Sequence, residues 1–205
     1  MSTATYTPKA DEIKALREET AAPMMDCRKA LIEAGGDIAK AKEVLLARGA
    51  AAAEKKAERS ANEGLVTAYV HAGGKIGVLV EVNCETDFVA RNPKFGELSR
   101  DIAMHVAAMS PQYLDRESVP AGVLEAVKTE LAASVPPGKP ADIVTKIVDG
   151  KLNKWFEDNV LLDQRFVKDD SVSITDLINT AVGFLGEKIK VRRFSKFALG
   201  DDQQQ

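Results

Sequence analysis

Cysteine and histidine are scarce in this chain, with two of each among 205 residues. Cys27 and Cys84 form neither a disulfide framework nor the paired spacing of a zinc site. Such cysteines are typical of small buried hydrophobic residues in a reducing compartment. His71 and His105 have no cysteine or second histidine at ligand spacing. We therefore expect no metal site and no cofactor.

Aromatic residues are also few, at 5% of the chain, whereas apolar residues make up 45%. The core should therefore consist mostly of Ala, Leu, Ile and Val. The formal net charge of −3 leaves no overall basic field that could bind a nucleic-acid backbone. A local basic cluster near the C-terminal end lacks an interleaved aromatic platform, so we expect a solvated or partner-facing strand and no direct nucleic-acid binding. This cluster comprises Lys190, Arg192, Arg193 and Lys196.

Long hydrophobic runs are missing as well. No apolar stretch approaches the ~18 residues of a membrane helix. Residues 1–7 carry neither an apolar run nor an arginine-rich amphipathic pattern of a targeting segment. We expect a soluble, cytoplasmic protein without membrane contact.

The sequence pattern of residues 1–49 predicts three helices. Pro8 and Pro23 suit helix starts, because proline loses no needed N–H at the first helical position. Asp37 can cap a third helix, which Gly49 would close. The sequence thus predicts a three-helix domain over 1–49. An alanine-rich, charged linker over 50–62 follows, which we interpret as helical, with disorder as the alternative.

The remainder predicts an α+β domain over 63–200, with helices packed on a short antiparallel sheet, and a disordered tail over 201–205. β-Branched strands flank Gly73-Gly74, which is a hairpin signal. We expect a loop from Asn83 to Arg91. The expected strands are Leu65–Val70, Ile76–Val82 and Ile189–Leu199, and the expected helices begin at Pro93, near Val123, near Ile143 and at Val172.

No catalytic motif is evident. Gly73-Gly74-Lys75 fails as a phosphate-binding loop, because Tyr69 stands where a further glycine is needed and Ile76 where Ser or Thr must follow the lysine. Neither cysteine has a sequence signature of nucleophilic catalysis. A small hydrolase that uses scattered carboxylates is an alternative without a convergent site.

Phe88 is the unusual residue of the expected loop, since loops normally place polar side chains in water. An exposed phenylalanine would be a good protein-binding anchor. The alternative, which composition alone favours, is that Phe88 packs under its own helix.

Four segments of the sequence are distinctive. Residues 20–37 are TAAPMMDCRKALIEAGGD, and residues 63–92 are EGLVTAYVHAGGKIGVLVEVNCETDFVARN. LLDQRFVKDD begins at Leu161 and IKVRRFSKFALG at Ile189. All four segments resemble the elongation factor Ts family. The likeness spans Pro8 to Gly200.

The resemblance implies a non-enzymatic guanine-nucleotide exchange factor in translation elongation. Such a factor binds elongation factor Tu in its GDP-bound and nucleotide-free forms, dislodges magnesium and releases GDP so that GTP can bind. The chain itself would bind neither magnesium nor nucleotide. An alternative from another class is a ubiquitin-associated-like adaptor that binds a partner without exchange activity.

The resemblance also assigns roles to residues. The N-terminal domain is similar to ubiquitin-associated domains and would dock on the GTPase domain of elongation factor Tu through Leu16, Met24 and Met25. A second segment would intrude beside the partner's nucleotide site, with the phenylalanine as wedge. That segment comprises Thr86, Asp87, Phe88 and Val89.

Some features depart from the family pattern. Ala21 stands where glycine is common, and Arg165 where proline is frequent. Longer members carry a second core half with an inserted antiparallel coiled coil, which we expect to be missing here. Short members can pair through their core sheets, so a homodimer is expected.

Overall fold

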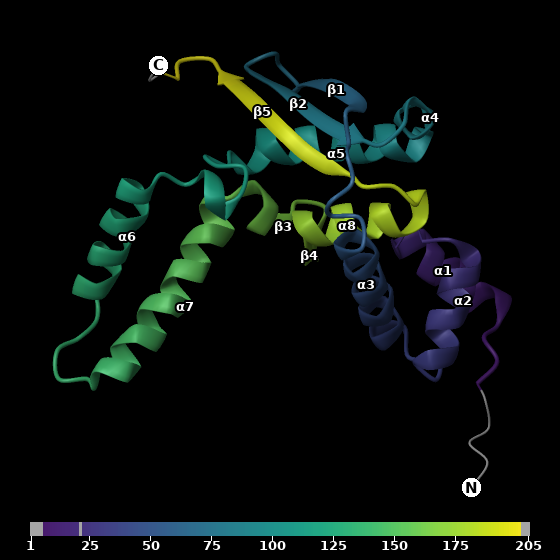
Figure 1. Cartoon of the computed structure of the whole chain (residues 1–205), viewed down its shortest axis with the longest axis horizontal. Coiled ribbons are helices and arrows are strands. Elements are labelled where there is room, and N and C mark those ends of the chain that lie inside the picture. Colours follow the sequence, from purple (N-terminus) through teal and green to yellow (C-terminus); the bar gives the residue numbers. More distant parts are fainter. Residues whose placement is uncertain (1–5, 21, 202–205) are drawn as a thin grey trace, which may run out of the picture. The chain divides into compact units, whose positions relative to one another are not determined.

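The computed structural model describes residues 6–20 and 22–201 (Figure 1). Ala21 and residues 202–205 of the predicted tail lie outside the described residues. The fold is α+β, as predicted, and its contacts group into two compact units. The first comprises Met1–Thr67, Glu81–Arg100 and Asp176–Arg192, and the second Ala68–Val80, Asp101–Thr175 and Arg193–Gln205. The domain boundaries at 49, 62 and 200 stay a prediction.

Three helices form the N-terminal part, namely α1 (Ala10–Thr20), α2 (Met24–Glu33) and α3 (Ile38–Glu54). They enclose a small core without a buried aromatic side chain among its described residues. The predicted cap of α3 is confirmed, because the Asp37 carboxylate accepts a hydrogen bond from the Lys40 N–H at 3.1 Å. The fully buried members of this core are Leu16, Cys27, Ala30, Leu31 and Ala41.

Gly49, at which the sequence predicts that the three-helix unit closes, lies inside α3, which continues to Glu54. The alanine-rich stretch after Gly49 has high helix propensity and carries the helix onward. A glycine is needed at position 49 for a different reason, which is the lack of space for a side chain. A Cβ atom at position 49 would lie 2.8 Å from the backbone oxygen of Asn179 in α8 (Ile174–Leu185). Gly49 therefore permits a close approach of two helices.

A three-stranded sheet has the strand order β1 (Glu63–Val70), β2 (Ile76–Cys84) and β5 (Lys190–Ala198). The predicted hairpin between β1 and β2 is confirmed. Gly73 and Gly74 have φ angles of 89° and 69°, which favour glycine. Along β2, Val78, Val80 and Val82 are buried, whereas Leu79 between them is exposed.

Helix α5 (Pro93–Met109) begins at the predicted proline. Helix α8 begins two residues later than predicted, because the preceding residues form a ribbon in which β3 (Arg165–Phe166) pairs antiparallel with β4 (Asp169–Ser173). This ribbon is not visible in the sequence, since strands this short have no apolar periodicity. Arg165 lies on β3, and its guanidinium donates to the Ser171 carbonyl at 3.3 Å.

Helices α6 (Ala121–Ala133) and α7 (Ala141–Asn159) pack against each other as an antiparallel hairpin (Figure 1). Both helices are predicted from the sequence, near Val123 and near Ile143. Val160 after α7 packs with Phe156 and Val119 in a small core at the base of this hairpin. Two short 3-10 helices, Arg116–Ser118 and Leu161–Asp163, complete the described elements.

Candidate functional site

The predicted loop from Asn83 to Arg91 contains one turn of helix, α4 (Asp87–Ala90), which corrects the sequence interpretation. Thr86 caps this turn, because its hydroxyl oxygen accepts from the Val89 N–H at 3.3 Å. The Thr86 carbonyl accepts from the Ala90 N–H at 3.2 Å. Four residues are too few for an apolar periodicity, so the sequence carries no clear helical signal here.

Phe88 and Val89 are neighbouring apolar residues of α4, and only Phe88 is exposed. Its side chain is 79% exposed, whereas the next residue, Val89, is 5% exposed. The alternative that Phe88 packs under its own helix is therefore wrong. A large aromatic side chain held in water is typical of a protein-binding anchor, because its burial by a partner is favourable.

Asp87 lies beside Phe88 at the protein surface. Its carboxylate pairs with the Arg91 guanidinium at 2.7 Å, and both side chains are more than half exposed. Such exposed pairs contribute little to stability. The pair with Arg91 therefore holds the Asp87 carboxylate only weakly.

Glu187 is a residue of this site that the sequence analysis missed. Its carboxylate accepts from the Thr86 hydroxyl at 2.6 Å, from the Thr86 N–H at 3.0 Å and from the Glu85 N–H at 3.1 Å. Glu187 lies in the connection between α8 and β5, far away in the sequence. A lone glutamate in such a connection carries no sequence signal for this contact.

The thiol of Cys84 supports the same turn from the end of β2. Its Sγ–H donates to the Thr86 carbonyl at 3.2 Å. Burial, together with the nearby negative charge of Glu187, raises the pKa of this thiol to about 11. The thiol thus stays protonated at neutral pH, where it acts as a hydrogen-bond donor and not as a nucleophile.

The N-terminal residues singled out by the resemblance divide into two groups. Met24 and Met25 begin α2 and are 52% and 56% exposed. Leu16 is fully buried among the three helices. The expectation that Leu16 forms part of a docking surface is therefore wrong for this conformation, since its side chain fills the core beneath that surface.

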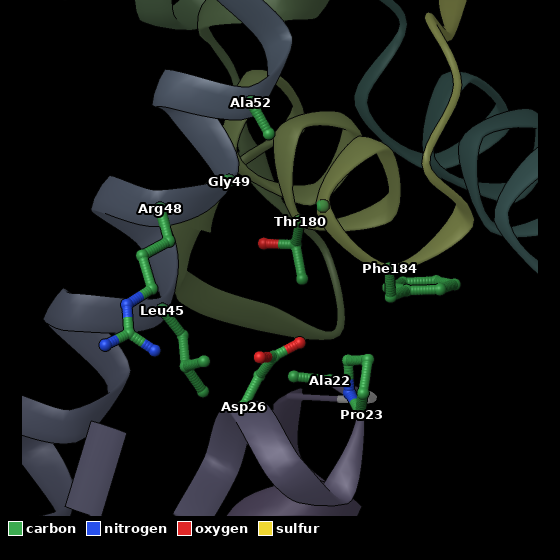
Figure 2. Close-up of a pocket in the computed structure, with 10 residues that line it drawn as sticks. Ala22, Pro23, Asp26, Leu45, Arg48, Gly49, Ala52, Thr180 and Phe184 are labelled. Atoms are coloured by element: carbon green, nitrogen blue, oxygen red, sulfur yellow. The ribbon is translucent and has the colours of Figure 1, made fainter. Parts of the chain in front are cut away.

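A cavity of about 140 Å³ lies between the start of α2, the middle of α3 and α8 (Figure 2). It is smaller than the roughly 300–1,000 Å³ of a typical small-molecule site. Its two charged residues are engaged nearby, because Arg48 pairs with Glu33 at 2.7 Å and Asp26 with Lys29 at 3.9 Å. The cavity therefore does not suit a nucleotide.

Within residues 6–20 and 22–201, no three His, Cys, Asp or Glu side chains are grouped to hold a metal ion. Over the same residues, no helix combines the length and apolar character needed to cross a membrane.

Comparison with known proteins assigns the family. The family model of elongation factor Ts matches residues 9–201. Relatives named elongation factor Ts include that of Caldanaerobacter subterraneus subsp. tengcongensis, which is 51% identical over 94% of this chain and 96% of its own. Those of Citrifermentans bemidjiense and Anaeromyxobacter sp. are 53% and 54% identical over 94% of this chain and 89% and 88% of their own. The chain therefore belongs to the elongation factor Ts family.

Proposed function

We propose that this protein is a nucleotide-exchange factor of translation elongation that binds elongation factor Tu with GDP, dislodges magnesium and promotes GDP release. Membership of the elongation factor Ts family supports the exchange role. The observation that carries the finer proposal is the 79% exposure of Phe88 on the turn after β2. An apolar side chain held in water in this way is suited to insertion into a partner.

The proposed mechanism is thermodynamic linkage. A factor that binds empty partner more tightly than loaded partner must weaken nucleotide binding by the same ratio. Phe88 would wedge between partner side chains, with Asp87 beside it and with Thr86 and Val89 as supports. Magnesium offsets much of the phosphate charge, so its loss removes a major attraction for GDP. Each step is a binding step, so we propose protein–protein binding without covalent chemistry, cofactor or bound metal.

Docking of the N-terminal domain would bring the wedge to its target. We propose that residues 1–49 contact the GTPase domain of elongation factor Tu through Met24 and Met25, which are half exposed. Flexible methionine side chains adapt well to a partner surface. Residues 50–62 would connect this domain to the exchange domain over 63–200.

We also propose that the protein forms a homodimer through its sheet and acts in the cytoplasm, without direct contact to nucleic acid or membrane. Support for the homodimer comes from exposed apolar side chains on the strands of the second compact unit. Val70, Leu79 and Phe197 are 66%, 47% and 53% exposed. A second copy that covers them would remove this surface from water.

The experiment is release of a fluorescent GDP analogue from purified elongation factor Tu. We expect the protein to accelerate release, and to do so in proportion to its concentration until the partner is saturated. An adaptor without exchange activity would bind the partner, as seen by light scattering, and leave the release rate unchanged. That result would contradict the proposal.

A further inference from the structure

Two segments far apart in the chain meet at the base of α4, and both belong to the first compact unit. The Glu187 carboxylate uses both oxygens there, with Oε1 on the Thr86 hydroxyl at 2.6 Å and Oε2 on the N–H groups of Thr86 and Glu85 at 3.0 and 3.1 Å. Three donors thus converge on one carboxylate. Hydrogen bonds to a charged acceptor are the stronger kind.

The contact is reciprocal. The N–H of Lys188 donates to Glu85 Oε1 at 2.6 Å, while the Glu85 N–H donates to Glu187. The other Glu85 oxygen pairs with Arg59 at 3.4 Å, and the Lys188 ammonium donates to the Ala57 carbonyl. The two glutamates therefore tie the turn to the α8–β5 connection and to the segment that follows α3.

Thr86 is held through every polar group it has. Its N–H and hydroxyl hydrogen go to Glu187, its hydroxyl oxygen accepts from Val89, and its carbonyl accepts from Cys84 and Ala90. Phe88 is only two residues farther along, and its exposed ring gains little from packing within the chain. The backbone at Thr86 therefore sets where α4 presents Phe88.

We propose that Glu187 is a positioning residue for nucleotide exchange, which fixes the Thr86 turn so that Phe88 is presented to the partner in one orientation. The proposal rests on the proposed function. A backbone turn that is already ordered loses less conformational entropy when the ring is inserted. Without Glu187 the turn would sample other conformations within the bound complex, so only a fraction of complexes would place the ring correctly at any moment, and the maximal rate would fall.

The charge and shape of Glu187 both matter for this role. Glutamine keeps the length but has one acceptor oxygen in place of two, so it can accept either from the two N–H groups or from the Thr86 hydroxyl, and not from all three donors. Alanine removes all three contacts. The geometry therefore predicts a graded series, with the wild-type protein first, Glu187→Gln second and Glu187→Ala last.

The test measures release of the fluorescent GDP analogue at saturating factor, together with the concentration of factor at half saturation. We expect Glu187→Ala to lower the maximal rate roughly tenfold and Glu187→Gln to lie between, with half-saturation changed less than about twofold. Glu125→Ala is the control, because Glu125 forms an exposed pair with Lys128 within α6. It should match the wild-type protein in both quantities.

A second measurement, on the free protein, tests whether Glu187 orders the Thr86 turn. It also shows whether the rest of the fold stays intact. Amide hydrogen exchange should speed up at Glu85 and Thr86 in Glu187→Ala, while the amides of α3 and α5 keep their protection. Unchanged protection at Glu85 and Thr86 would overturn the inference, as would lost protection with a wild-type maximal rate. A wild-type protein that fails to accelerate GDP release would instead overturn the proposed function. The release assay on the wild-type protein shows this before any variant is compared.

Discussion

Phe88 and Val89 are consecutive residues of α4, yet the side chain of Phe88 is 79% exposed and that of Val89 is 5% exposed. Phe88→Ala should therefore change the free energy of unfolding by less than about 0.5 kcal/mol. Val89→Ala should lower it by roughly 1–3 kcal/mol, because it removes buried methyl groups. Denaturant unfolding measures both values.

The rate of nucleotide exchange should be affected more by Phe88→Ala than by Val89→Ala, which is the reverse of their order in stability. Phe88→Ala should slow GDP release from elongation factor Tu by more than about tenfold, since burial of the ring by the partner is lost. Val89 supports the turn from the core, so at a temperature where it stays folded Val89→Ala should slow release less than Phe88→Ala does. Val167→Ala is the control, because Val167 is exposed at 43% outside the proposed exchange segment, and it should keep its activity. Equal exchange rates for Phe88→Ala and the wild-type protein would rule out the wedge.

Met24 and Met25 offer a test of docking that is separate from the wedge. The double variant Met24→Ala/Met25→Ala should raise the half-saturating concentration about tenfold or more and leave the maximal release rate nearly unchanged, because it removes binding made before and during exchange alike. Met109→Ala on α5 is the control, since Met109 is 43% exposed. A fall in maximal rate with unchanged half-saturation would contradict the assignment.

Gly49 should not tolerate a side chain, although it lies inside a helix. A Cβ atom there would lie 2.8 Å from the Asn179 carbonyl oxygen, so Gly49→Ala should lower the unfolding free energy by roughly 1–3 kcal/mol. Gly150 on α7 has open space around the same position. Gly150→Ala should therefore stabilise by up to about 1 kcal/mol through helix propensity. Thermal unfolding of the pair checks this, and equal effects would contradict the close helix approach.

His105 is fully buried on α5, and its ring nitrogens both have partners. The Val167 N–H donates to Nδ1 at 3.2 Å, so the ring proton lies on Nε2 and is donated to the Gln164 Oε1 at 2.9 Å. Gln164 in turn donates to the Asp158 carbonyl at 3.0 Å. The arrangement fits a neutral imidazole, and burial lowers the pKa of His105 below its usual 6.5, although the bond to Gln164 opposes the shift.

The stability of the fold should therefore fall in mild acid. Below pH 6.5 the unfolded chain binds a proton at His105 that the folded chain does not, so the unfolding free energy decreases as the pH drops, until the folded-state pKa is passed. Denaturant unfolding between about pH 5 and 8 measures the slope. His105→Gln should flatten it. The same slope in the wild-type protein and the variant would contradict a neutral His105.

The helices and the hairpin were predictable because their signals are local. Pro93 and Asp37 mark helix starts, and Gly73-Gly74 marks a turn, each through the conformation of a few neighbouring residues. The short turn α4 and the β3–β4 ribbon were missed because elements of this length have no apolar periodicity. Gly49 was misread because a glycine permits both a helix end and a close helix approach, and only the position of Asn179 decides between them.

The candidate site was predictable only in part. Composition favoured a buried Phe88, and the resemblance to elongation factor Ts alone gave it a surface role. The role of Glu187 could not be predicted from the sequence, because only the folded chain brings it into contact with Thr86. Leu16 was misassigned because a sequence match identifies a segment without saying which of its side chains face water.

The proposed homodimer has a direct test in the exposed apolar residues of the sheet. Leu79 is 47% exposed on β2, and Leu79→Glu would place a charge in the interface, where burial without a partner is costly. We expect light scattering to give a molar mass of about twice the 22.1 kDa of one chain for the wild-type protein. The variant should have the mass of one chain. Val167→Glu is the control, because Val167 is similarly exposed at 43% but lies outside the three-stranded sheet. A wild-type protein that scatters as one chain would exclude the dimer.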